Sequence, residues 1–141
     1  MKLYLAGPIT KCNKEEAETW RREFEEEFGE NNCYNPLDLD YFDEDFGIWR
    51  WLRIPKEAIK IEKAMILDSD YVIANMNKTE SIGTFFEIMF AFCNEIPVLL
   101  CSEYKEIREY EWINEHCKEV FENIEELKSY LRKKVFKGVI K

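Results

Sequence analysis

The stretch that decides the fold reads Asp70-Tyr71-Val72-Ile73-Ala74-Asn75-Met76 and then Ser81-Ile82-Gly83-Thr84-Phe85-Phe86-Glu87. Its first part is an apolar run typical of a buried strand, and a helix-like stretch follows at 88–93. Glu87 therefore lies in the first turn or two of a helix, just past the carboxyl end of a strand. Ligands bind at this place in an open α/β sheet, so the Glu87 carboxylate is a candidate nucleophile or ligand for sugar hydroxyls. The alternative is that Glu87 only complements the helix N-terminus as part of a capping pattern.

Strands and helices alternate along the rest of the chain. Short apolar runs predict strands at 2–6, 33–35, 71–75, 97–101 and 119–121. Apolar residues at helical spacing predict helices at 14–28, 55–67, from 83 or 84 to 93, at 104–114 and at 124–134. Strands separated by helices predict a parallel sheet with helices on both faces, and so an α/β fold in a single domain spanning 1–141.

The segment 37–53 is expected to be irregular and is rich in aspartate and aromatic side chains. It begins at the edge where the loops after the strands gather, and segments of this length often form binding lids. Its aromatic side chains have two interpretations, stacking on a flat ligand or packing, including packing on a neighbouring subunit: Tyr41, Phe42, Phe46, Trp49 and Trp51.

Composition disfavours several classes of protein. The chain has 141 residues, of which 46% are hydrophobic, and its net charge of −9 disfavours DNA or RNA as the main partner. The five cysteines form no CxxC pair, which predicts buried free thiols in a reducing cytoplasm. His116 is the only histidine, so a metal site and histidine-driven catalysis are disfavoured. No apolar run approaches the length of a membrane span, and no secretory signal is visible.

The loops that follow parallel strands meet at one edge of the sheet and supply the candidate binding residues. In chain order these candidates are Gly7, Pro8, Ile9, Thr10, Asp38, Asn75, Ser81, Gly83 and Thr84. Asp68 and Asp70 precede a strand instead of following one. We therefore expect them at the opposite edge, as turn and cap residues.

Four motifs together resemble the nucleoside 2-deoxyribosyltransferase family, which includes related deoxynucleoside 5-monophosphate N-glycosidases. The motifs span the chain from the first predicted strand to the fourth and read Lys2-Leu3-Tyr4-Leu5-Ala6-Gly7-Pro8-Ile9, Asp70-Tyr71-Val72-Ile73-Ala74-Asn75, Ser81-x-Gly83-Thr84-x-x-Glu87-x-x-x-Ala91 and Pro97-Val98-Leu99. The resemblance implies a flavodoxin-like (Rossmann-like) doubly wound sheet of about five strands in three α/β/α layers. It also implies cleavage of an N-glycosidic bond without cofactor or metal, by a homo-oligomer whose dimers share residues between active sites.

The resemblance assigns roles to three side chains. Glu87 matches the nucleophile, and a carboxylate there can stabilise an oxocarbenium-like sugar and then trap it covalently, as in retaining glycosidases. A second base then takes the sugar in a transferase, and water takes it in a hydrolase. Tyr4 matches a tyrosine that holds the nucleophile by a hydrogen bond, although a packed strand residue is an equal alternative. Glu62 stands where many members have an aspartate that handles the departing base, and its side chain is one methylene longer.

Ser81 is the departure that bears on the substrate. Classical transferases tend to have an aspartate here, which binds the 5-hydroxyl of the sugar, whereas the monophosphate hydrolases have a serine. A hydroxyl and loop amides before a helix would hold a phosphate, with Thr10 and Lys11 adding contacts. The first loop, however, reads Gly7-Pro8 and lacks the serine- and arginine-rich form of those hydrolases, and Ser81 is also a common helix cap or turn residue.

Three functions follow from these observations, in order of preference. The first is a nucleoside 2-deoxyribosyltransferase, and the second is a 2'-deoxynucleoside 5'-monophosphate N-glycosidase that uses the same Glu87. The third is a non-catalytic nucleotide-binding module, because a fold by itself does not dictate chemistry.

Overall fold

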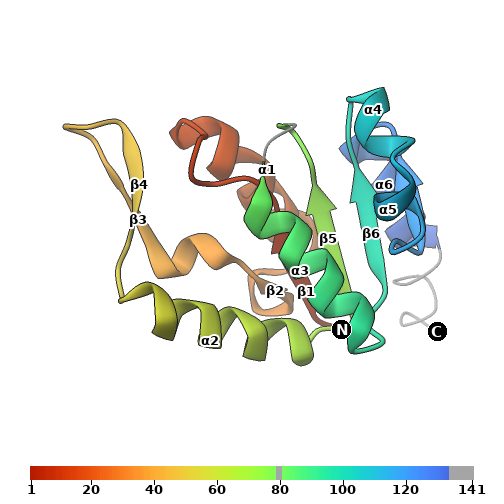
Figure 1. Ribbon diagram of the computed structural model, residues 1–141, viewed down its shortest axis with the longest axis horizontal. Coiled ribbons are helices and arrows are strands. Elements are labelled where there is room, and N and C mark those ends of the chain that lie inside the picture. The colour runs from red at the N-terminus through yellow and green to blue at the C-terminus, as the bar shows by residue number, and fades with distance from the viewer. Residues whose placement is uncertain (79–80, 134–141) are drawn as a thin grey trace.

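The central sheet has five strands in the order β2-β1-β5-β6-β7, and every neighbouring pair is parallel (Figure 1). The computed structural model describes residues 1–78 and 81–133. In order along the chain, the sheet strands are β1 (Leu3–Ala6), β2 (Cys33–Tyr34), β5 (Tyr71–Asn75), β6 (Val98–Cys101) and β7 (Glu119–Phe121). The first strand lies inside the sheet between the second and the third, which is the flavodoxin-like order. The predicted parallel α/β sheet is confirmed.

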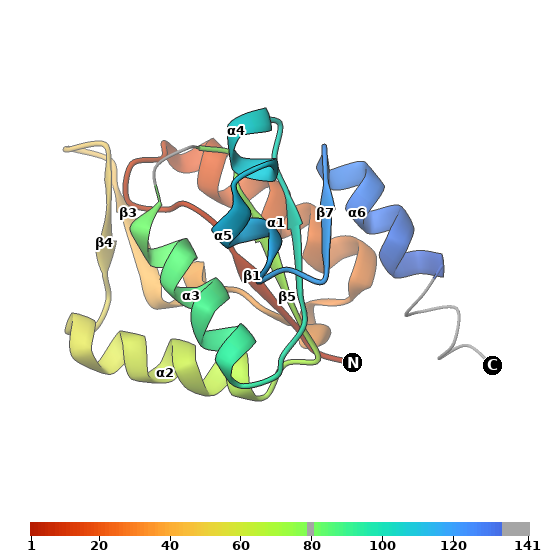
Figure 2. The ribbon, with the colours of Figure 1, turned by 45° about the vertical axis from the view of Figure 1, so that its right-hand side comes forward.

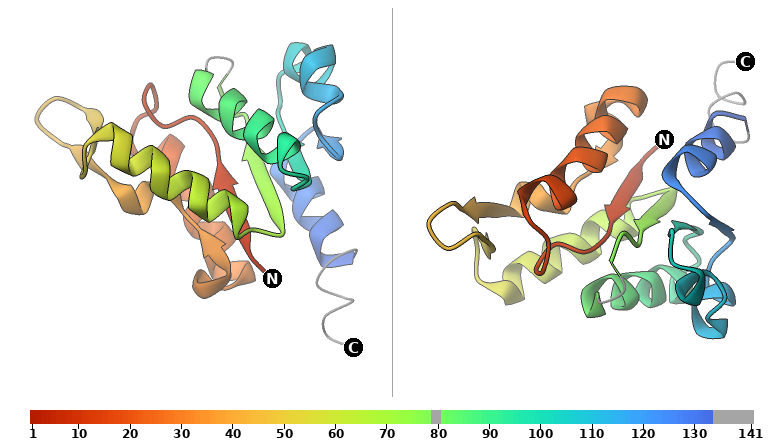
Figure 3. Two further views of the ribbon diagram at one scale, coloured as in Figure 1. Left: turned by 60° about the horizontal axis from the view of Figure 1, so that its bottom comes forward. Right: turned by 90° about the horizontal axis from the view of Figure 1, so that it is seen from above.

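Helices cover both faces of this sheet and complete three layers (Figure 3). One face is covered by α1 (Lys14–Phe28) and α6 (Ile124–Leu131). The other is covered by α2 (Pro55–Leu67), α3 (Ile82–Cys93) and the short α4 (Lys105–Arg108) and α5 (Glu111–Asn114). A 3-10 turn, Glu30–Asn32, joins α1 to β2.

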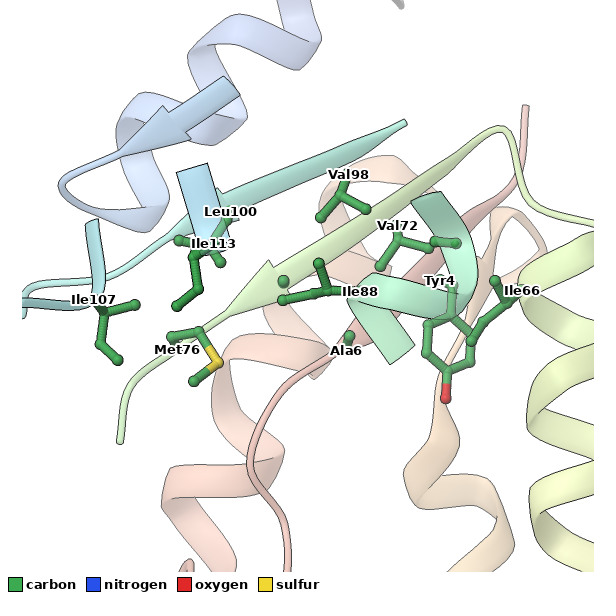
Figure 4. Close-up of a cluster of buried hydrophobic side chains, with 12 residues drawn as sticks. Tyr4, Ala6, Ile66, Val72, Met76, Ile88, Val98, Leu100, Ile107 and Ile113 are labelled. Carbon is green, nitrogen blue, oxygen red and sulfur yellow. The ribbon is translucent and has the colours of Figure 1, made fainter. Parts of the chain in front are cut away.

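Side chains that alternate between the two faces of each strand build an apolar cluster on either side of the sheet. In β1, Leu3 and Leu5 pack against α1 and α6, whereas Tyr4 and Ala6 face α2 and α3. A strand places successive side chains on opposite faces, so one buried strand serves both layers. Tyr4 lies at one end of its cluster beside Ile66, with its hydroxyl directed away from the apolar side chains (Figure 4).

Capping fixes where α1 begins and ends. The side chain of Asn13 accepts a hydrogen bond from the Glu16 backbone, and the Glu16 carboxylate accepts one from the Asn13 backbone, which forms a capping box. Gly29 ends the helix with a φ of 99°, a conformation that side chains rarely adopt. The predicted bounds of this helix are therefore confirmed at both ends.

The expectation of an irregular segment at 37–53 is wrong. After a 3-10 turn, Pro36–Leu39, the chain forms an antiparallel hairpin from β3 (Asp40–Asp43) and β4 (Ile48–Trp51). The Asp43 carboxylate accepts hydrogen bonds from two backbone amides of the turn, and Gly47 takes a φ of 65°. Figure 2 shows the hairpin standing apart from the sheet, at the end where α2 begins.

A continuous helix at 104–114 is also wrong, because the chain breaks at Tyr110 into α4 and α5. Ile107 and Ile113 both pack into the core. Six residues along one continuous helix would place them about 120° apart around its axis, so a break is needed for both to face inward. At the C-terminal end α6 closes at Leu131, and the predicted end at Lys134 lies outside the described residues.

Two further expectations concern thiols and membranes. All five cysteines have free thiols, but only Cys12 and Cys101 are buried, so burial was predicted correctly for two. Among the residues that the structure describes, no helix combines the length and apolar character needed to cross a bilayer.

Candidate active site

A cavity of about 1090 Å³ opens between the loop after β1, the hairpin, α2 and α3. Its walls are mostly apolar and aromatic, with a few acidic and basic groups between them. The lining side chains include Pro8, Ile9, Asp40, Trp49, Trp51, Glu62, Ser81, Phe85, Phe86, Glu87 and Phe90. Planar aromatic walls with a few polar groups are typical of sites for small heterocyclic ligands.

Glu87 lies in this cavity, in the second turn of α3, and a side chain of the central sheet binds its carboxylate. The hydroxyl of Tyr4 donates a hydrogen bond to Glu87 Oε2. Tyr4 is fully buried in β1, so it is both a core strand residue and the partner of Glu87. The first turn of α3 has no acidic residue, and Ser81 makes no side-chain cap to the helix backbone. The capping interpretation of Glu87 therefore finds no support in the hydrogen bonds.

Arg21 lies under the loop that follows β1, and sequence reasoning missed it. It is fully buried in α1, and its guanidinium donates to the carbonyl oxygens of Leu5 at 3.2 Å, Ala17 at 2.7 Å and Gly7 at 3.0 Å. A signal was present, because Arg21 follows Ala17 by four residues and so falls on the apolar face of its helix.

Burial raises the pKa of three carboxyl groups around the cavity. The pKa of Glu87 rises to about 7, with the Tyr4 hydrogen bond and the charge of Arg21 acting in the opposite direction. For Glu62 the pKa rises to about 8, mainly by burial and then by the nearby charges of Glu87 and Asp40. Burial also raises the pKa of Asp40 to about 6. Glu87 and Glu62, whose pKa values lie near neutral pH in one cavity, are suited to nucleophilic and acid–base roles.

The structure brings most of the sequence-predicted site residues to the cavity. Gly7, Pro8, Ile9, Thr10, Ser81 and Gly83 line it together with Glu62 and Glu87. Thr84 is buried beneath them, and its hydroxyl shares a hydrogen bond with that of Ser81. Gly7 lies so close to the end of β5 that an added Cβ would stand 2.8 Å from the carbonyl oxygen of Asn75.

Besides Thr84, two predicted binding residues lie outside the cavity lining. The amide oxygen of Asn75 faces the Cys101 thiol at 3.5 Å. Asp38 is exposed and lies 4.0 Å from Arg22 on α1. Asp68 and Asp70 are at the opposite edge as expected, where Asp68 accepts from Tyr34 and Asp70 accepts from the Lys2 backbone at 2.7 Å.

The hairpin supplies two residues that sequence reasoning missed, Asp40 and Arg50, and two that it had named. Asp40, Arg50 and the two tryptophans Trp49 and Trp51 form one wall of the cavity. The tryptophans were named with both a ligand-stacking and a packing interpretation, and they line the cavity. The pattern Asp40-Tyr41-Phe42-Asp43, followed by a turn ending at Gly47, was a hairpin signal that could have placed Asp40. Across 1–78 and 81–133, no group of three His, Cys, Asp or Glu residues is arranged to hold a metal ion.

Comparison with family models and with curated proteins gave no match. Comparison with solved structures gave matches. A conserved protein from Enterococcus faecalis V583 aligns with a TM-score of 0.70 at 16% identity, over 96% of this chain and 99% of that one. A 2-deoxyribosyltransferase from the psychrotolerant bacterium Bacillus psychrosaccharolyticus aligns with a TM-score of 0.67 at 20% identity, over 92% of each chain. At these identities the likeness shows the fold, which both proteins share with this chain over nearly its whole length.

Proposed function

We propose that this protein cleaves the N-glycosidic bond of a 2'-deoxynucleoside through a covalent glycosyl–Glu87 intermediate and transfers the deoxyribosyl group to another base. The observation that carries this proposal is the hydrogen bond from Tyr4 to Glu87 at the wall of the aromatic cavity. It orients one carboxylate oxygen and leaves Oε1 without a hydrogen bond among the described residues. The fold shared with a 2-deoxyribosyltransferase supports the same reaction.

The two steps of the reaction follow from the raised pKa values of Glu87 and Glu62. Glu87 attacks C1' of the sugar as a carboxylate, the C1'–N bond breaks, and its electron pair goes to the base nitrogen. Glu62, which is protonated at neutral pH because its pKa is raised to about 8, gives its proton to the departing base. An acceptor base then attacks C1', the ester bond to Glu87 breaks, and Glu62 takes the proton of the acceptor.

The proposal is tested with a panel of 2'-deoxynucleosides and their 5'-monophosphates, each with and without an added acceptor base. Chromatography of free bases and of new nucleosides follows the reaction. We expect a new nucleoside only when an acceptor base is present, and none with Glu87→Gln. The absence of turnover together with measurable ligand binding would overturn the proposal and favour a non-catalytic nucleotide-binding module.

A second candidate function is hydrolysis of 2'-deoxynucleoside 5'-monophosphates by the same Glu87. Ser81 favours it, because its hydroxyl lines the cavity directly before α3, where an anion would meet the positive end of the helix dipole. Base release without an acceptor, from monophosphates only, would select this function. Ser81→Asp should then weaken binding of monophosphates more than binding of nucleosides, and equal effects would leave Ser81 as a turn residue.

We also propose that the protein is a homo-oligomer. Three large apolar side chains on the hairpin and on α3 are strongly exposed, with exposed fractions of 73% for Phe46, 74% for Ile82 and 71% for Phe86. Ile82 and Phe86 line the cavity, so a partner that covers them would also reach the site. Sedimentation equilibrium should give a mass above 17.0 kDa, and a monomer at micromolar concentration would contradict the proposal.

A further inference from the structure

Arg21 is a buried cation that contacts no acidic side chain among residues 1–78 and 81–133. Its exposed fraction is 0%, and the three acceptors of its guanidinium among the described residues are the backbone carbonyl oxygens of Leu5, Gly7 and Ala17. None of these acceptors carries a full charge. Removing a lone cation from water costs several kcal/mol, so a fold that retains one must oppose its charge from a distance.

Glu87 is the acidic group that opposes this charge most strongly. Burial lowers the pKa of Arg21 to about 10, and against that effect the charge of Glu87 acts first, followed by Tyr4, Cys12 and Asp40. The effect is mutual, because the charge of Arg21 lowers the pKa of Glu87 against its own burial. The charged forms of the two groups therefore stabilise each other.

The hydrogen bonds of Arg21 also fix the backbone that carries the site. Leu5 follows Tyr4 in β1, and Gly7 begins the loop that lines the cavity. Ala17 ties the guanidinium to its own helix, and the Trp20 ring lies against it with its centroid 4.7 Å from Cζ. One side chain thus joins β1, the loop after it and α1.

We propose that Arg21 is a positioning residue of this site: its buried positive charge keeps Glu87 ionised for attack, while its three hydrogen bonds hold the loop that borders the substrate. The catalytic half of this statement rests on the proposed function. Other ionisable groups lie on the elements around Glu87 and must stay in place during the test: Tyr4 on β1, Lys11 in the first loop, Asp40 on β3, Arg50 on β4, and Glu62 and Lys63 on α2.

The test follows the ionisation of Glu87 directly, by NMR titration of carboxyl carbons in protein labelled with ¹³C-glutamate, with Glu87→Gln identifying the signal. Two substitutions separate charge from hydrogen bonding: both Arg21→Gln and Arg21→Lys lose the guanidinium, and only Arg21→Lys keeps a positive charge. Arg22→Gln is the matched control, because Arg22 is the next residue and pairs instead with Glu25 at 2.9 Å, with half of its side chain exposed.

We expect Arg21→Gln to raise the pH midpoint of Glu87 by about one unit, which is a tenfold loss of the ionised form below that midpoint. Arg21→Lys should keep most of the original midpoint, and Arg22→Gln all of it. An unchanged midpoint in a folded Arg21→Gln protein would overturn the proposal and leave Arg21 with a purely structural role.

A second measurement uses the unmodified chain, so it stands even where the Arg21 variants fail to fold. The ¹⁵Nε and ¹³Cζ signals of Arg21 should shift with the pH midpoint of Glu87, and this shift should vanish in Glu87→Gln. Signals that stay constant through that midpoint would contradict the coupling. Neither measurement needs turnover, so a failure of this inference is distinguishable from a failure of the proposed reaction.

Discussion

At the residue scale, two glutamates in one cavity have different pKa values because their surroundings differ. Glu87 has a hydrogen bond from Tyr4 and the opposing charge of Arg21, and its pKa is about 7. Burial raises the pKa of Glu62 to about 8, and the charges of Glu87 and Asp40 add to this effect while the charge of Arg21 opposes it. The lower value suits the nucleophile and the higher value suits the proton donor.

These values set the pH dependence of the proposed reaction. Glu87 must be ionised, so kcat/KM should rise with pH through about 7, and Glu62 must be protonated, so it should fall as pH rises through about 8. We expect a narrow optimum between these limits in initial rates measured from pH 5 to 10. Glu62→Gln should lower the rate about a hundredfold or more and remove the alkaline limb. An alkaline limb that persists in this variant would assign the proton donor elsewhere.

Removing the Tyr4 hydroxyl should impair the reaction without unfolding the protein. A hydrogen bond to a charged group contributes about 1.5–3 kcal/mol, so Tyr4→Phe should lower kcat/KM roughly 10- to 100-fold and move the acid limb to higher pH. Tyr34→Phe is the matched control, because the Tyr34 hydroxyl bonds Asp68 at the opposite edge of the sheet. Equal effects of the two substitutions on the rate would show that the contact with Glu87 has no special part in the reaction.

At the element scale, the loop between β1 and α1 must pass close to the end of β5. A Cβ on Gly7 would meet the Asn75 carbonyl oxygen at 2.8 Å, a ring atom of Trp20 at 3.1 Å and a guanidinium nitrogen of Arg21 at 3.3 Å. Since a backbone carbonyl in the sheet cannot give way cheaply, Gly7→Ala should lower the free energy of unfolding by about 1–3 kcal/mol in urea titrations. Gly83→Ala is the control, because nothing lies within 4 Å of its added Cβ. A loss of stability as large in Gly83→Ala would contradict this account of the loop.

The same scale shows where sequence patterns were sufficient. The strand at 71–75 and the helices at 14–28 and 55–67 have the predicted bounds, because each combines clear apolar periodicity with a local start or stop signal. The hairpin at 40–51 was missed because its two strands form a sheet of their own and carry exposed aromatic side chains. The break between α4 and α5 depends on where two isoleucines must point, which only the tertiary packing decides.

At the scale of the whole molecule, the doubly wound topology brings the site together from four parts of the chain. Topology alone predicts which strand ends share an edge, and on that ground sequence reasoning placed Glu87. Tyr4 and Glu62 were named only through the resemblance to a known family. Sequence reasoning did not find Arg21 or Asp40. Arg21 reaches the site only because its long side chain extends from α1 through the core, and Asp40 reaches it only because the hairpin forms. Sequence reasoning also included Asn75, which ends β5, and Asp38, which follows β2, but both lie outside the cavity lining.

The raised pKa of Glu62 also links the site to the stability of the molecule. The folded state binds this proton more tightly than the unfolded chain, where a glutamate has a pKa of about 4.3. The contribution of this bound proton to the free energy of unfolding is therefore full below about pH 4 and is lost as pH rises to about 8. Glu62→Gln should raise the melting temperature by about 3 °C or more at pH 9 and change it little at pH 4. A pH-independent difference between the two proteins would contradict the raised pKa.

The central claim is that Glu87 forms a bond to the anomeric carbon of a deoxynucleoside, and trapping that bond tests it most directly. The protein is mixed with a 2'-deoxynucleoside that it turns over, in the absence of an acceptor base, quenched rapidly in acid, digested and examined by mass spectrometry. We predict a deoxyribosyl adduct on the peptide that contains Glu87 and no adduct in Glu87→Gln. Turnover with an adduct on another residue, or full activity of Glu87→Gln, would contradict the claim.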